Sequence, residues 1–192
     1  MGKAIVVSAT PIILNAVKPM LTGKNRDEAF ELPFIYGHNL YYLPDLELIK
    51  PLAEPVGFLY DMAEADDIPP LYRLEGFHNA LQYDAGHPRP DVLAVFAKKD
   101  GNIAGMAGAS ADCARMWQIG MDVLPKYRHN GLAAYLVNWL TLEVMKRQMV
   151  PYYGTAPSNI ASQRVAHRAG YCPSWICAYK GKFDGFELLP TS

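Results

Sequence analysis

Residues 117–133 read Trp117-Gln-Ile-Gly-Met-Asp-Val-Leu-Pro-Lys-Tyr-Arg-His-Asn-Gly-Leu-Ala133 and join an alternating segment to a basic turn and a periodic segment. In the first part, apolar residues alternate with polar residues or glycine, which is typical of a strand with one buried face. After Pro125, apolar residues recur with helical spacing at Leu132, Tyr135, Leu136, Trp139 and Leu140. The sequence therefore predicts a strand, a turn and a helix packed on a sheet.

The start of this predicted helix, near Asn130 or Gly131, is suited to an anion. The first N–H groups of a helix have no intrahelical acceptor. Gly131 has no side chain to keep a ligand away from those groups. We therefore predict that a pyrophosphate binds at this turn.

The turn closely resembles motif A of the GNAT family of N-acetyltransferases, in which Arg or Gln is followed three residues later by Gly and two residues after that by Gly or Ala. Here the motif reads Arg128-His129-Asn130-Gly131-Leu132-Ala133. The likeness continues in Val123, Pro125 and Tyr127 upstream, and in Asn159, Ser162, Val165, Gly170 and Tyr171 downstream. It covers roughly residues 55–185. The resemblance implies that the six motif residues hold the pyrophosphate of acetyl-coenzyme A (acetyl-CoA).

Other ligand classes are disfavoured. The chain has no Gly-x-Gly-x-x-Gly of a Rossmann site and no glycine followed by Lys-Ser or Lys-Thr, as a phosphate loop requires. A net charge of −1 argues against nucleic acid as a partner. Basic residues nevertheless gather around the two motifs, where phosphates would lie: Lys126, Arg128, His129, Arg164 and Arg168.

Cysteine usage and hydropathy bear on the cellular location. Cys113, Cys172 and Cys177 form neither an even framework nor a Cys-x-x-Cys pair, so no disulfide scaffold and no zinc site are expected. The five histidines lack ligand spacing, so no metal is predicted. No apolar run approaches a membrane span, and the start lacks a secretory signal. We therefore expect a cytoplasmic protein without membrane contact.

Residues 1–54 are predicted to form an N-terminal extension, followed by a GNAT-like acetyl-CoA-binding domain over residues 55–192. Within the extension, residues 34–44 suggest a hairpin whose turn is Gly37-His38-Asn39. The same run is too apolar for a disordered tail, so the extension should pack on the domain. It could serve as a lid, an acceptor wall or a homodimer interface, and the sequence leaves these alternatives open.

Within the domain, residues 56–62 are expected to form a strand, and residues 68–81 a helix with an apolar stripe. Asp100-Gly101 predicts a hairpin between strands at 92–98 and 103–110. Small side chains on the second of these strands indicate a closely packed helix or, less often, a ligand. A strand at 151–155, a helix at 160–169 and a strand at 175–180 follow. The resemblance implies a mixed α/β fold with a central, mostly antiparallel, splayed sheet flanked by helices.

The resemblance also implies where the rest of the cosubstrate binds. The strand ending at Val123 and the next strand, near Tyr153, should splay apart to admit the pantetheine arm. Backbone groups of Met121 and Val123 would pair with that arm. Asn159 would lie beside the pantetheine and the thioester. The alternative for Asn159 is an ordinary helix N-cap.

Catalysis requires a neutral amine, donors for the developing oxyanion and a proton for the departing thiolate. The family's usual proton donor is a tyrosine seven residues after the motif asparagine, but that position is Ala166 here. Ser162 lies one turn earlier on the same helix face and resembles the Asn-x-x-Ser variant of acetyltransferases that modify protein N-termini. Ser162 is therefore the candidate catalytic residue, and a surface serine without a role is the alternative.

No residue is clearly the general base. Asp122 lies on the critical strand, and further candidates precede it: Glu64, Asp66, Asp67, Tyr72, Glu75 and His78. A base acting through water is also open. The sequence favours an enzyme that moves an acetyl group from acetyl-CoA to a small-molecule or peptide amine by direct attack. The alternative, which the missing tyrosine favours, is a non-catalytic acyl-CoA-binding sensor or interaction module.

Overall fold

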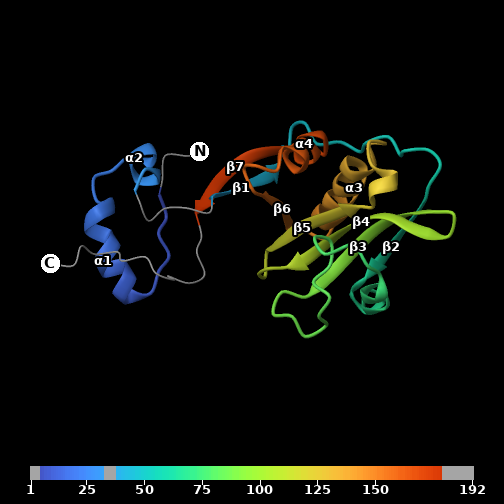
Figure 1. Ribbon diagram of the computed structural model, residues 1–192, viewed down its shortest axis with the longest axis horizontal. Helices are drawn as coiled ribbons and strands as arrows, with labels where there is room; N and C mark the ends of the chain where they lie inside the picture. Colours follow the sequence, from blue (N-terminus) through green and yellow to red (C-terminus); the bar gives the residue numbers. More distant parts are fainter. Residues whose placement is uncertain (1–4, 33–37, 179–192) are drawn as a thin grey trace.

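Hydrophobic segments between residues 38 and 178 form one seven-stranded sheet, and two helices, α3 (Leu132–Lys146) and α4 (Ile160–Arg168), pack on it (Figure 1). The computed structural model describes residues 5–32 and 38–178. The other α-helices are α1 (Pro11–Leu21) and α2 (Arg26–Phe30). The strands are β1 (His38–Pro44), β2 (Leu59–Glu64), β3 (Asp91–Lys99), β4 (Asn102–Ala111), β5 (Met116–Val123), β6 (Val150–Thr155) and β7 (Tyr171–Ala178).

The strands lie in the order β2-β3-β4-β5-β6-β1-β7. β5 and β6 run parallel, and the other neighbouring pairs run antiparallel. The predicted fold class, a mixed α/β architecture with a mostly antiparallel sheet flanked by helices, is confirmed. The predicted hairpin is also confirmed, since Asp100 (φ 51°) and Gly101 (φ 76°) take the positive φ values of a tight turn between β3 and β4.

Helix α3 forms the main layer on one face of the sheet and confirms the predicted periodic helix (Figure 1). Leu132, Leu136 and Leu140 are fully buried against the strands. Burial of each leucine contributes roughly 1.5–3 kcal/mol. Gly105 on β4 allows this close contact, because a Cβ atom there would lie 3.2 Å from the side chains of both Leu132 and Leu136.

The segment after β2 is not the α-helix predicted for residues 68–81. It forms short 3-10 turns, Ala65–Asp67 and Pro69–Arg73, and then a turn at residues 77–81, here called the Asn79 turn. Leu74 has an extended backbone with a ψ of 138°, and Gly76 has a φ of +90°, so the helical turns end before residue 77. These local breaks override the apolar stripe, whose side chains still pack in the core, as Phe77 and Leu81 do.

The Asn79 turn lies against the opposite face of the sheet from α3. A Cβ atom on Gly108 would come within 1.8 Å of the Ala80 carbonyl oxygen, and one on Gly120 within 1.7 Å of the Asn79 carbonyl oxygen. The small residues of β4 therefore have two causes. Gly105 admits a helix, as expected, whereas Gly108 admits the backbone of a turn, which the sequence analysis did not foresee.

Strand β1 lies between β6 and β7 and corrects the hairpin predicted for residues 34–44. His38 and Asn39, expected in a turn, are strand residues opposite Ala178 and Cys177. Residues 33–37, including Gly37, lie outside the described residues. β1 thus belongs to the sheet of the domain, although it precedes the boundary predicted at residue 54. An extension that packs on the domain stays a prediction for the residues before β1.

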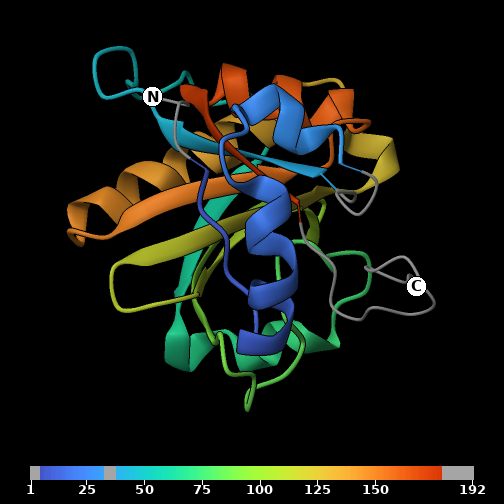
Figure 2. The same cartoon turned by 90° about the vertical axis from the view of Figure 1, so that its left-hand side faces the viewer.

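Helices α1 and α2 lie outside the sheet and its two helices (Figures 1 and 2). The ring of Phe30, at the end of α2, contacts that of His38 at the start of β1, with a centroid distance of 5.0 Å. Across residues 5–32 and 38–178, no helix has both the length and the apolar composition needed to span a bilayer.

Candidate active site

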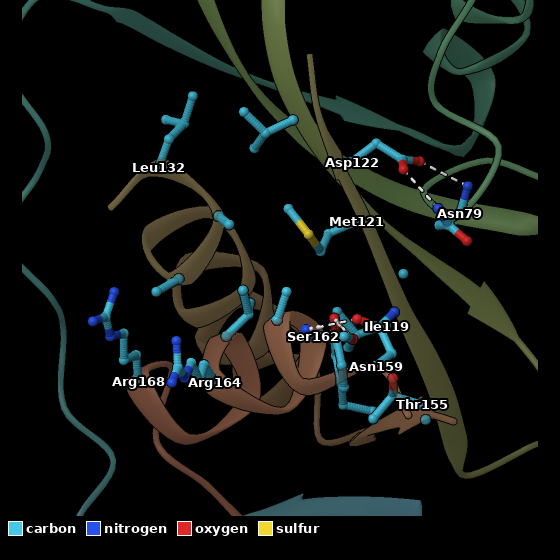
Figure 3. A pocket seen from close by; sticks show the side chains of 18 of the residues that line it. Asn79, Ile119, Met121, Asp122, Leu132, Thr155, Asn159, Ser162, Arg164 and Arg168 are labelled. Atoms are coloured by element: carbon cyan, nitrogen blue, oxygen red, sulfur yellow. Dashed lines mark hydrogen bonds between the residues drawn. The ribbon is translucent and has the colours of Figure 1, made fainter. Parts of the chain in front are cut away.

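A cavity opens where β5 and β6 separate. The two strands pair only from Met116 opposite Val150 to Ile119 opposite Tyr153. Beyond that point β5 continues to Val123 and pairs with no other described strand on its β6 side, which agrees with the predicted splay. The cavity has a volume of about 950 Å³ and is lined by residues of β1, β5, β6, α3 and α4 and by Asn79 (Figure 3).

One end of this cavity is the turn before α3. Gly131 is the N-cap residue and has a left-handed conformation with φ of 76°, and His129 has a φ of 66°. Within the described part of the chain, the backbone N–H groups of residues 129–134 donate no hydrogen bond to another residue. A Cβ atom on Gly131 would meet nothing within 4 Å. Accessible N–H groups at a helix start attract an anion.

Basic side chains stand around the same end. Arg164 and Arg168 of α4 line the cavity (Figure 3) and form no ion pair with another described residue. Arg128 also lines it, and its Nε donates to the Val123 carbonyl oxygen at 3.0 Å. The cavity wall contains every predicted site residue except Asn130: Met121, Val123, Arg128, His129, Gly131, Leu132, Ala133, Asn159 and Ser162.

Asp122 is already engaged by the Asn79 turn. Met121 and Asp122 point to opposite sides of β5 (Figure 3). The Asp122 carboxylate accepts from the Asn79 N–H at 2.7 Å, the Asn79 side-chain amide at 2.6 Å and the Ala80 N–H at 3.2 Å. A carboxylate can accept about four hydrogen bonds, and the turn uses three of those positions on Asp122. Asp122 therefore holds the turn in place and is not supported as the base.

The other base candidates lie away from the cavity. Its wall includes none of Glu64, Asp66, Asp67, Tyr72, Glu75 and His78. Glu64 forms an ion pair with Arg147. The Tyr72 hydroxyl donates to Asp91 at 2.9 Å. Burial is the larger cause and this hydrogen bond the second cause of a pKa of Tyr72 far above its usual range. Of the alternatives considered from the sequence, a base acting through water is the one that agrees with these positions.

Asn159 acts as a helix cap at the cavity. It is the N-cap residue of α4, and its Oδ1 accepts from the Ser162 N–H at 3.0 Å. This is the ordinary capping role considered from the sequence. The amide NH₂ group of Asn159 forms no hydrogen bond with another described residue, so it remains available to a ligand in the cavity. The two readings of Asn159 are therefore compatible.

The Ser162 hydroxyl forms a 2.8 Å hydrogen bond with the hydroxyl of Tyr153. Tyr153 lies on the cavity wall where the pairing of β5 and β6 ends, and only 4% of its surface is exposed. Burial raises the pKa of Tyr153, and the bond to Ser162 only partly opposes this, so the phenol keeps its proton at neutral pH. Ala166 is buried in the core. Tyr153 was not among the predicted site residues, and its only signal in the sequence was its place at the predicted splay.

Comparison with known proteins identifies the class of protein. Residues 56–171, more than half of the chain, match the model of the Acetyltransferase (GNAT) family. The chain therefore belongs to the GNAT acetyltransferase family, which confirms the resemblance found in the turn before α3. A search among curated proteins found no match.

Solved structures show the same fold. An acetyltransferase of the GNAT family from Colwellia psychrerythraea aligns with a TM-score of 0.54 and 15% identity, over 80% of this chain and 60% of that one. A GCN5-related N-acetyltransferase-like protein from Streptococcus suis gives 0.53 and 16%, over 84% and 73%. A GCN5-related N-acetyltransferase from Kribbella flavida gives 0.51 and 21%, over 72% and 55%. This chain thus spans less than two thirds of the Colwellia and Kribbella proteins.

Proposed function

We propose that this protein transfers an acetyl group from acetyl-CoA to the nitrogen of an amine. The observation that carries the proposal is one continuous cavity that joins the free N–H groups of residues 129–134 to the unpaired edge of β5 beyond Ile119. The first feature suits a pyrophosphate, and the second suits an extended arm that pairs with backbone.

The pyrophosphate, the pantetheine arm and the thioester of acetyl-CoA each have matching residues. The turn from Arg128 to Ala133 would hold the pyrophosphate, and Arg164 and Arg168 would offset its charge. Met121 and Val123 would pair with the pantetheine through their backbone groups. The Val123 carbonyl already accepts from Arg128, but a carbonyl has two lone pairs and so can accept once more. The Asn159 amide would contact the arm near its thioester.

The reaction needs three proton transfers besides the new bond. An acceptor that arrives as an ammonium ion loses one proton to solvent through water, and its nitrogen then attacks the thioester carbonyl carbon. The carbon–sulfur bond breaks as the amide forms, the thiolate takes a proton, and the amide nitrogen loses its second proton. We propose that the linked hydroxyls of Ser162 and Tyr153 supply the proton to sulfur and are then reprotonated from solvent.

We expect Ser162→Ala to lower kcat and kcat/KM together, because the hydroxyl acts mainly as charge develops on sulfur. A thiol with a pKa near ~8.5 leaves without a strong acid, so the loss should be at the low end of ~10²–10⁴-fold. Tyr153→Phe should produce a similar loss, and the double variant should lose little more than either single one. Steady-state kinetics measure all three. A raised KM for acetyl-CoA at unchanged kcat would make Ser162 a binding contact only.

The enzyme is tested directly by thiol release. Purified protein with acetyl-CoA and a panel of primary amines should release free thiol in proportion to the amide formed. A non-catalytic acyl-CoA-binding module is the second candidate, favoured by the engaged carboxylate of Asp122 and by alanine at position 166. Tight binding of CoA in calorimetry without thiol release for any amine would favour that module. No thermal shift with CoA would refute both.

We also propose a cytoplasmic location. The three cysteines are unpaired, and Cys113 is exposed, as a reducing compartment allows.

Residues before β1 are proposed to act as an extension of the domain. Partial proteolysis that quickly removed them while leaving a stable fragment would contradict the packing of that extension.

A further inference from the structure

The cavity continues through the sheet to the face opposite α3 and α4. Its wall includes Asn39, Tyr41, Asn79 and Gln118 in addition to the residues of α3 and α4. Side chains alternate along β5, so Gln118 and Asp122 point away from the face on which Ile119 packs in the α3 core. A thioester seated beside Ile119 and Tyr153 could therefore be reached from this second face, where an acceptor would lie.

We propose that this second face binds the acceptor amine, and that the acceptor is a primary monoamine carrying a flat apolar body. The inference rests on the proposed function and deepens it. The site has two walls. One is the ring of Tyr41 on β1, and the other is the Asn79 turn with the Asp122 carboxylate behind it.

The Tyr41 wall is a supported aromatic surface. Its ring stacks on that of Trp175 with a centroid distance of 5.0 Å and an interplanar angle of 5°. Tyr152 lies 6.0 Å from each of these rings, and its hydroxyl donates to Asp112. The Tyr41 ring also lies directly over Gly154, where a Cβ atom would come within 2.9 Å of it. Three rings from three strands thus hold a flat surface in one orientation, which suits a planar partner.

The charges of the cavity favour a single positive charge on this face. Asp122 is the only carboxylate on the described cavity wall, while Arg128, Arg164 and Arg168 stand at the other end. The Asp122 carboxylate accepts three hydrogen bonds of about four that it can accept, which leaves a position for an ammonium group. Asp112 adds little net charge, because Arg89 lies 3.4 Å away. A polyamine would need several carboxylates, whereas a monoamine needs one and gains from the aromatic surface.

Amine preference tests the chemical class. We expect 2-phenylethylamine to be acetylated with a kcat/KM about tenfold above that of 2-cyclohexylethylamine, which has the same chain and amine but a ring that is not flat. Spermidine should be at least as poor a substrate as the cyclohexyl compound. Equal rates for the two monoamines, or a preference for spermidine or for a peptide N-terminus, would overturn the proposal.

Substitution of Tyr41 tests the location. Tyr41→Leu should raise KM for 2-phenylethylamine about tenfold, with an unchanged dissociation constant for CoA, because one contact between aromatic rings is lost. The matched control Tyr41→Phe keeps the ring and should change KM little. An unchanged KM for Tyr41→Leu would place the acceptor elsewhere.

A binding measurement separates failure of this site from failure of the enzyme. Calorimetry of 2-phenylethylamine with the full chain saturated with CoA needs no turnover. Binding that Tyr41→Leu weakens about tenfold and Tyr41→Phe retains would support the site even if no thiol were released. In that case only the proposed acetyl transfer would be refuted. Absence of binding to the parent protein would refute the acceptor site, whatever the thiol assay shows.

Discussion

Replacement of Gly131 by glutamate should weaken CoA binding at least ~100-fold, the largest effect we expect on ligand affinity. The added carboxylate would stand among the free N–H groups of residues 129–134, where it would take the place of a phosphate and repel the others. The fold should survive, because a Cβ atom at this position meets nothing within 4 Å. The cost of a positive φ, here 76°, is about 1–2 kcal/mol for a residue with a side chain.

Calorimetric titration with CoA measures this effect, and Gly131→Asn is the matched control. Asparagine tolerates the left-handed conformation and carries no charge. It should therefore lose far less affinity than glutamate at similar thermal stability. A dissociation constant for Gly131→Glu equal to that of the parent protein would refute the proposed anion site at this turn.

Gly120→Val should have the largest effect on stability, a loss of about 3 kcal/mol or more in the free energy of unfolding. A Cβ atom at Gly120 would come within 1.7 Å of the Asn79 carbonyl oxygen. The Asn79 turn cannot move away without breaking its three hydrogen bonds to Asp122. Backbone cannot rotate aside as a side chain can, so either the turn detaches or the sheet distorts.

Urea denaturation of Gly120→Val measures the loss. Gly86→Ala is the control, since its φ is not positive and its Cβ atom would make only an ordinary contact of 3.4 Å with Asp84. The control should change stability by less than ~0.5 kcal/mol. If Gly120→Val also stayed within that limit, the close approach of the Asn79 turn to β5 would be wrong.

The parts of the fold that could be predicted are those governed by neighbours in sequence. The helix after Gly131 follows from apolar residues spaced at 3.6 per turn, and the β3–β4 hairpin follows from Asp100-Gly101. The same periodic argument failed at residues 68–81, because the backbone leaves the helical conformation at Leu74 and Gly76. The spacing of apolar residues indicates which side chains are buried. Whether the segment forms a helix depends on the backbone conformations that its residues adopt.

The cavity residues that we propose for the cosubstrate could be named from the sequence to a similar degree, since motif A is a local pattern of one turn and one helix start. The residues around the chemistry were not. Asp122 had been considered as a base, but its carboxylate is held by a turn 43 residues earlier. Ser162 had been singled out on its helix, but its hydroxyl partner Tyr153 lies on a neighbouring strand. Nothing in the spacing of these residues indicates such contacts.

Local pattern thus accounts for the strand, turn and helix of residues 117–140 and for the family to which the chain belongs. Long-range pairing accounts for β1 between β6 and β7 and for the stacking of Tyr41, Tyr152 and Trp175. The physical reason is that periodicity and turn propensity act within a few residues, whereas strand order is set by which distant segments bury most surface together. The turn that we propose for the anion can therefore be identified from one segment, whereas the proposed acceptor wall forms only once three strands are paired.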